Sequence, residues 1–209
     1  MKRCKYRILA IVMIICMLAT TVVYADSYET ETVIIDGVTY TVVMQETANC
    51  NTVSMYDNNN VLTDKYCYMK DEHKLVNVLT GEIIYAEESD STQTKNRSAD
   101  ADGYYYYGTY SYPFGQINGV ATLVSGLLAI GIPFGIATEI AATVKVVGLI
   151  SAPTGALGVV IEVVIDEFGK VDSQYQYCKR IVNTYDKISE NDYHIDGPRE
   201  WIRKTSIDA

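Results

Sequence analysis

Hydrophobic residues concentrate in one tract near the middle of this chain. The run Gly119–Thr138 carries no charge, and it lies inside a longer apolar, glycine-punctuated tract over residues 116–165. Only Glu139, Lys145 and Glu162 interrupt that tract with charge, while the rest of the chain is polar, acidic and rich in tyrosine. A tract of this kind must either be buried in a protein core or enter a lipid bilayer.

The breakers inside the tract allow two interpretations. As one element, Gly119–Thr138 is a transmembrane helix, because about 20 residues span about 30 Å of hydrocarbon. If glycine and proline instead mark turns, each helix is only about 20–24 Å long, and we favour this interpretation. The elements are then a helix over 116–130, a turn at 131–133, a helix over 134–149, a turn at 151–155, and a third segment, helix or strand, over 156–168.

Small and helix-breaking residues punctuate the two helices and permit close approach of their backbones. An apolar helical hairpin wrapped by polar elements suits a protein that stays soluble until it meets a membrane. We therefore predict a membrane-active segment, whereas the alternative is an ordinary buried helical core. The segment's marker residues are Gly119, Ser125, Gly126, Ala129, Gly131, Pro133 and Gly135.

Residues 26–86 have the alternation of β-strands. Within 32–42, Asp36–Gly37 is typical of a two-residue hairpin turn. Pairing Ile35 with Val38 then places the apolar residues 33, 35, 38, 40 and 42 on one face. Further short extended segments up to residue 85 predict a small antiparallel sheet.

Polar residues 87–103 show no apolar periodicity and predict a linker. The next segment, 104–112, is a predicted strand that Pro113 should end, and we expect one or two more strands within 174–185. The tyrosines form either a sheet with aromatic side chains on both faces or an interfacial aromatic belt. The candidate interfacial residues are Tyr104, Tyr105, Tyr106, Tyr107, Tyr110, Tyr112 and Trp201.

These elements predict an α+β fold. A small antiparallel β-rich N-terminal unit (26–86) is followed by the linker (87–103). The region 104–209 is then an apolar helical hairpin or bundle flanked by tyrosine-rich strands.

Residues 1–25 have the basic start, apolar core and small final residues of a secretory signal peptide, so we expect cleavage after Ala25 and secretion. Removing the four basic residues of this segment takes the formal net charge from −9 to about −13. Nucleic acid is therefore excluded as a partner, because phosphate binding needs clustered lysine and arginine.

No catalytic, cofactor-binding or metal-binding motif is recognisable, and no small-molecule substrate is evident. Cys50 and Cys67 flank a turn-rich segment, and export favours a disulfide between them. Cys178 is then free or pairs between chains. Because only His73 and His194 could activate its thiol, and neither lies in a known motif, we expect a protein that is not an enzyme.

The stretch Gly103–Thr109, GYYYYGT, lies between a polar N-terminal part and a Gly/Ala/Val-rich block in an exported chain. This layout resembles that of large secreted bacteriocins of Gram-positive bacteria, the geobacillin-26-like group. The resemblance implies an antimicrobial protein without catalytic residues, although the negative charge departs from the cationic habit of many membrane-active peptides. We therefore expect a secreted, non-enzymatic, bacteriocin-like protein whose helical block perturbs target membranes, with a bacterial membrane or surface receptor as its partner. The alternative is an extracellular or cell-surface binding module with a buried apolar helical core.

Overall fold

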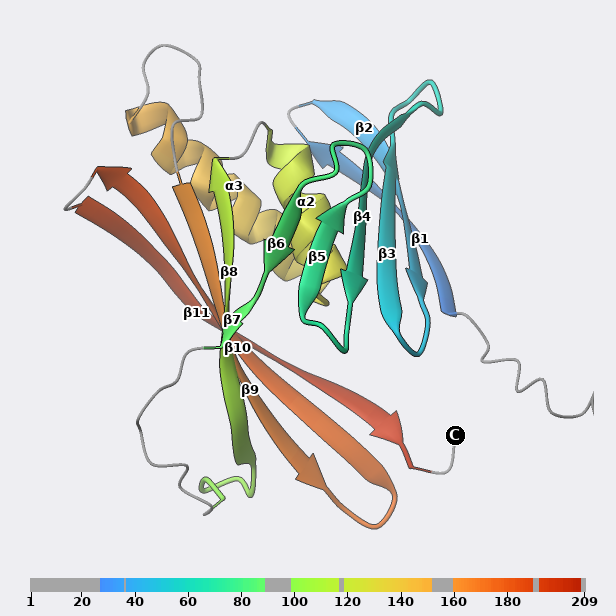
Figure 1. The fold of residues 1–209 in the computed structure, drawn as a ribbon, viewed down its shortest axis with the longest axis vertical. Coiled ribbons are helices and arrows are strands. Elements are labelled where there is room, and N and C mark those ends of the chain that lie inside the picture. The colour runs from blue at the N-terminus through green and yellow to red at the C-terminus, as the bar shows by residue number, and fades with distance from the viewer. Residues whose placement is uncertain are drawn as a thin grey trace, which may run out of the picture.

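In the described parts of the chain, the fold consists of two antiparallel sheets and two helices (Figure 1). The computed structural model describes residues 27–35, 37–88, 99–116, 119–151, 160–189 and 192–207. The predicted signal peptide, Asp36 of the hairpin turn and residues 89–98 of the predicted linker lie outside the described residues.

The first sheet is a six-stranded meander in chain order. Its strands are β1 (Ser27–Ile35), β2 (Val38–Glu46), β3 (Cys50–Tyr56), β4 (Leu62–Met69), β5 (Lys74–Asn77) and β6 (Ile83–Tyr85). The predicted hairpin register is confirmed, since Ile35 pairs with Val38. On the predicted apolar face, Val33, Ile35 and Val42 are buried, while Val38 at the tip is exposed.

The second sheet has the strand order β11-β10-β9-β8-β7. Its strands are β7 (Glu87–Glu88), β8 (Tyr105–Gln116), β9 (Val160–Val171), β10 (Tyr175–Ser189) and β11 (Asp192–Ser206). β8 continues through Pro113, which we expected to end it. A register shift between Pro113 and Gly115 explains the difference, because a bulge accommodates a residue that has no N–H to donate.

The helices are α2 (Val120–Ala129) and α3 (Phe134–Ser151), separated by the predicted turn at 131–133. α2 contacts β3, β4, β5 and α3, whereas α3 contacts β10 and β11. Figure 1 shows both helices on the side of the six-stranded sheet that faces the second sheet. Residues 123–129 of α2 are all buried, as an apolar helix in a core requires.

The predicted fold class is wrong, because the protein is mainly β rather than an α+β fold built on an apolar helical bundle. Residues 160–171, whose type the sequence left open, form β9, where runs of valine and isoleucine fill a buried strand. The C-terminal region forms two long strands. Each helix therefore packs against a sheet as well as against the other helix.

The interpretation of the apolar tract as a membrane-active helical hairpin is also wrong. No helix in the described parts of the chain combines the length and the apolar character needed to cross a bilayer. The described part of the tract forms two short helices and a strand, and their apolar side chains fill the interior.

One hydrophobic cluster joins the two sheets and both helices. Met55 of β3, Leu127 of α2, Ile140 of α3 and Ile165 of β9 are all fully buried members of it. A polar contact reinforces this junction, since the hydroxyls of Tyr68 on β4 and Tyr112 on β8 are hydrogen-bonded at 3.0 Å. The interior is therefore continuous from one sheet to the other.

Candidate functional site

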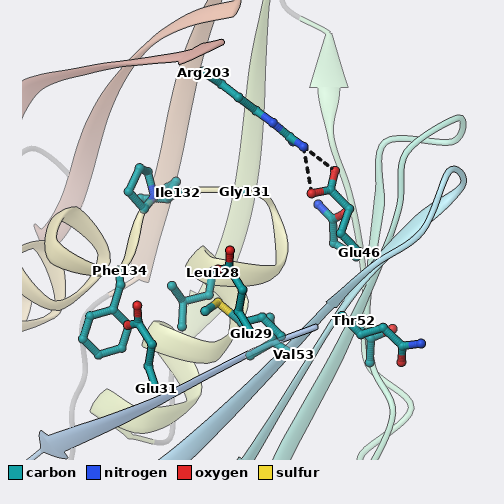
Figure 2. A pocket seen from close by; sticks show the side chains of 14 residues that line it. Glu29, Glu31, Glu46, Thr52, Val53, Leu128, Gly131, Ile132, Phe134 and Arg203 are labelled. Atoms are coloured by element: carbon teal, nitrogen blue, oxygen red, sulfur yellow. Dashed lines mark hydrogen bonds and ion pairs between the residues drawn. The ribbon is translucent and has the colours of Figure 1, made fainter. Parts of the chain in front are cut away.

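A cleft of 350 Å³ lies where the first sheet, the turn between the helices and the second sheet meet (Figure 2). Strands β1, β2 and β3 form one wall, and the end of α2 with the following turn forms the floor. Arg203 of β11 closes one side. Figure 2 shows its side chain reaching across the opening to Glu46 of β2.

The acidic wall of the cleft follows from the alternation of β1. Glu29 and Glu31 lie on the same face as Val33 and Ile35, because side chains alternate along a strand. That face is buried beneath the helices at residues 33 and 35 and becomes exposed and acidic at residues 29 and 31. Figure 2 shows both glutamates directed toward the helical floor of the cleft.

The floor is apolar and is held by a glycine cap at the end of α2. Gly131 has a φ of 87°, a conformation that glycine adopts without strain. Its N–H donates to the Leu128 carbonyl, and the Ile132 N–H donates to the Leu127 carbonyl, which is the Schellman pattern. This turn places the side chains of Leu128, Ile132 and Phe134 in the cleft.

The charge of Glu46 is compensated within the protein. Arg203 Nη2 donates to both of its carboxylate oxygens, at 2.9 and 2.8 Å, and Lys70 Nζ donates to Oε1 at 2.8 Å. Burial alone would raise the pKa of Glu46, but the hydrogen bonds and charges of Lys70 and Arg203 outweigh it and lower that pKa. The carboxylate of Glu46 therefore links β2 of the first sheet to β11 of the second through Arg203.

Glu29 and Glu31 differ in this respect. Among the residues that the structure describes, neither side-chain carboxylate has a hydrogen-bond or ion-pair partner, and both residues are exposed. Asn51 offers a further acceptor in the same wall. Its Nδ2 donates to the Ala129 carbonyl at 3.3 Å, while its buried Oδ1 has no partner within the described ranges.

A second hollow of 200 Å³ adjoins the cleft and shares Gly131 and Arg203 with it. It is lined by Cys178, Arg180 and Trp201, among others. The guanidinium of Arg180 is already engaged, since it donates to the Ile130 carbonyl at 3.0 Å and pairs with Glu167 at 2.7 Å. The open charges of the site are therefore the two carboxylates of β1.

The chemistry of the cleft lining suits the binding of a cationic side chain. The described lining of the cleft contains no histidine, cysteine or lysine that could act as a nucleophile or base. Within the described ranges, no group of three His, Cys, Asp or Glu residues could hold a metal ion. Carboxylates above an apolar floor can pair with a cation and cover its hydrocarbon stem.

Cys50 and Cys67, the predicted disulfide pair, lie close together on β3 and β4. They are half-buried and diagonal in register, since Cys50 pairs with Met69 and Cys67 with Thr52. Both are free thiols in this structure, and burial together with the neighbouring Cys50 thiol raises the pKa of Cys67. The disulfide stays a prediction.

The markers of the predicted membrane-active segment are parts of the scaffold. Ser125, Gly126 and Ala129 are buried in α2, where Gly126 lies directly against the ring of Phe114. Gly119 precedes α2, and Gly135 lies in the first turn of α3. Gly131 and Pro133 line the cleft, so two of the predicted residues do belong to the candidate site.

The candidate interfacial aromatics are distributed between core and surface. Tyr104 and Tyr112 are buried, whereas Tyr105 and Tyr107 are half exposed. The other members are partly buried: Tyr106 lies edge-on to Phe168, Tyr110 stacks on His73 with ring centroids 4.3 Å apart, and Trp201 packs against the core. A role at a membrane interface stays a prediction.

Sequence reasoning missed the residues that define the cleft. The alternation that placed Val33 and Ile35 on one face extends back to Glu29 and Glu31, so these two could have been found. Arg203 gave no such signal, because it lies in a segment that we did not expect to be a strand.

The chain matches no family model, and no curated protein and no solved structure is similar to it. The resemblance to secreted bacteriocins therefore stays a prediction.

Proposed function

We propose that this protein is an exported, non-catalytic binding module that takes a cationic, partly apolar segment of a partner into the cleft beside β1. One observation carries the proposal. The carboxylates of Glu29 and Glu31 stand over an apolar floor and have no ion-pair partner among the described residues, because Arg203 in the same cleft is paired with Glu46. A lysine or arginine side chain matches both features, since it has a charged head on a hydrocarbon stem.

The net charge of the chain supports the same partner. At −9 for the whole sequence, the protein attracts cations at long range and repels anionic partners. The cleft volume of 350 Å³ lies at the lower end of ligand sites, which suits one or two side chains of a larger partner. A macromolecular partner with basic side chains therefore fits better than a small metabolite.

Titration of the mature chain with a short cationic peptide tests the proposal. The probe is acetylated, amidated Leu-Lys-Leu-Lys, and the same peptide with glutamate in place of lysine is the ligand control. The double variant Glu29→Gln/Glu31→Gln should weaken binding about tenfold, because each exposed charge pair contributes about 0.2–1 kcal/mol. Binding of the wild type should also weaken as salt is added.

A matched double variant separates the cleft from general attraction to an acidic surface. Glu87→Gln/Glu88→Gln removes the same charge from two exposed, adjacent glutamates on β7. It should change the affinity less than twofold. Equal losses in the two double variants, or no binding of the cationic peptide to the wild type, would contradict the proposal.

A further inference from the structure

Strand β1 is an open edge of the first sheet. In the part of the chain that the structure describes, β1 is paired only with β2 and is the terminal strand of the six. Figure 1 shows it at the margin of the sheet, on the opposite side from β6. An edge strand presents a row of unpaired backbone groups to which another extended segment can hydrogen-bond.

The hairpin register determines which backbone groups are open. In a hairpin closed by two residues, the flanking pair Ile35–Val38 exchanges both hydrogen bonds, and bonded and non-bonded pairs then alternate along the strands. Ile34, Thr32, Thr30 and Tyr28 therefore direct their N–H and C=O groups away from β2. All four of these residues are exposed.

Two hollows lie along the inner face of this edge. The acidic cleft is beside Glu29 and Glu31, and an apolar groove of 370 Å³ lies at the other end of β1. Apart from Thr138 and Lys145, the groove is lined by apolar side chains, including Ile34 and Ile35 of β1. Along the inner face of β1, the residues therefore change from acidic at 29 and 31 to apolar at 33 and 35.

We infer that an extended segment of a cationic protein or peptide adds antiparallel to β1 as a seventh strand of this sheet. The added segment has the sequence pattern apolar–x–apolar–x–basic–x–basic. Its apolar residues then lie opposite Ile35 and Val33, and its basic residues lie opposite Glu31 and Glu29. Antiparallel addition continues the pattern of the whole sheet. The inference rests on the proposed function, since it specifies how the cationic partner is held.

A second copy of this chain is the other candidate occupant of the edge. Antiparallel pairing of two β1 strands would bring the glutamates of one copy near those of the other, and inward-pointing charges of this kind oppose edge-to-edge association. Charge complementarity therefore favours a basic segment.

The probe is the acetylated, amidated octapeptide Val-Thr-Val-Thr-Lys-Thr-Lys-Thr, titrated into the mature chain. In the inferred register its threonine N–H groups face β1, so N-methylation of those threonines removes the hydrogen bonds and keeps the charge. We expect the N-methylated peptide to bind at least tenfold more weakly. The reversed sequence, which has the same composition, should also bind more weakly.

Thr30→Pro provides the matching change in the protein. The N–H of Thr30 points away from β2, so proline removes an outward donor and leaves the ladder with β2 in place. Thr39→Pro is the control, because Thr39 is opposite Ile34 and beyond the end of β3. We expect Thr30→Pro to lower the affinity for the octapeptide at least tenfold and Thr39→Pro to change it less than twofold.

The outcomes separate this inference from the proposed function. Suppose that the wild type binds the N-methylated peptide as tightly as the unmodified one, and that Thr30→Pro binds the unmodified peptide as tightly as the wild type does. If Glu29→Gln/Glu31→Gln still weakens binding, strand addition is overturned and the cationic cleft stands. If no cationic peptide binds the wild type, both fail. A wild-type dimer that Thr30→Pro dissociates would assign the edge to a second copy and overturn the inference. If Thr30→Pro does not fold, the N-methylated peptide decides.

Discussion

Leu127→Ala tests whether the two sheets share one core. Leu127 is fully buried in α2, which contacts β3, β4 and β5 of the first sheet as well as α3. The substitution removes three carbon atoms at about 0.8 kcal/mol each and leaves a cavity. A Leu→Ala change in a core costs about 2.7–5 kcal/mol, so we expect a loss of about 3–4 kcal/mol in the free energy of unfolding.

Urea unfolding followed by two signals measures this loss in both sheets. Far-UV circular dichroism reports the whole chain, and the fluorescence of Trp201, the only tryptophan, reports β11 of the second sheet. With a slope of about 2 kcal/mol per M, the midpoint should fall by roughly 1.5–2 M in both signals. Val146→Ala, at an exposed position of α3, is the control and should shift the midpoint little.

A separate response of the two signals would refute the reasoning. If the circular dichroism midpoint falls while the Trp201 midpoint does not, the sheets have independent cores. A total loss below about 1 kcal/mol would show that Leu127 is not packed as described.

Three further predictions concern other parts of the fold. Gly126→Ala would bring a Cβ into collision with the ring of Phe114, so we expect thermal unfolding to show a loss of about 1–3 kcal/mol; an unchanged transition would contradict this packing. Burial raises the pKa of Asp186 above 3.8, so the free energy of unfolding should decrease as pH rises through that raised pKa. Asp186→Asn should abolish this decrease in urea titrations from pH 4 to 8. A variant with the same pH profile as the wild type would contradict this prediction. In the exported protein, Cys50 and Cys67 should resist alkylation until reduced, and reduction should cost about 3 kcal/mol for a loop of this size; alkylation of both without reductant would exclude the disulfide.

Local signals predicted those parts of the fold that depend on neighbouring residues. The Asp36–Gly37 pair and the alternation around it predicted the register of Ile35 with Val38, and the turn at 131–133 separated two helices at the expected place. These features require only a few consecutive residues, so the sequence alone is sufficient for them.

Long-range packing decided the rest. The sequence of β11 shows no regular alternation of apolar and polar residues, so its strand was not recognisable. In the structure its Ile195 and Ile202 are 60% and 50% exposed. The prediction of the fold class was wrong because an apolar helix has the same sequence pattern whether it packs on another helix or on a sheet. The cleft brings together Glu46 and Arg203, which are 157 residues apart in the chain.

Mapping of the peptide-binding surface by backbone amide chemical shifts tests the central claim most directly. On titration of the mature chain with the octapeptide Val-Thr-Val-Thr-Lys-Thr-Lys-Thr, we predict that the largest shifts occur along β1, at the outward-facing amides of Thr30 and Thr32, with further shifts at Phe134 in the cleft. Shifts of similar size at distant exposed carboxylates, such as Glu87 and Asp172, would contradict the claim, because they would show attraction to the acidic surface as a whole.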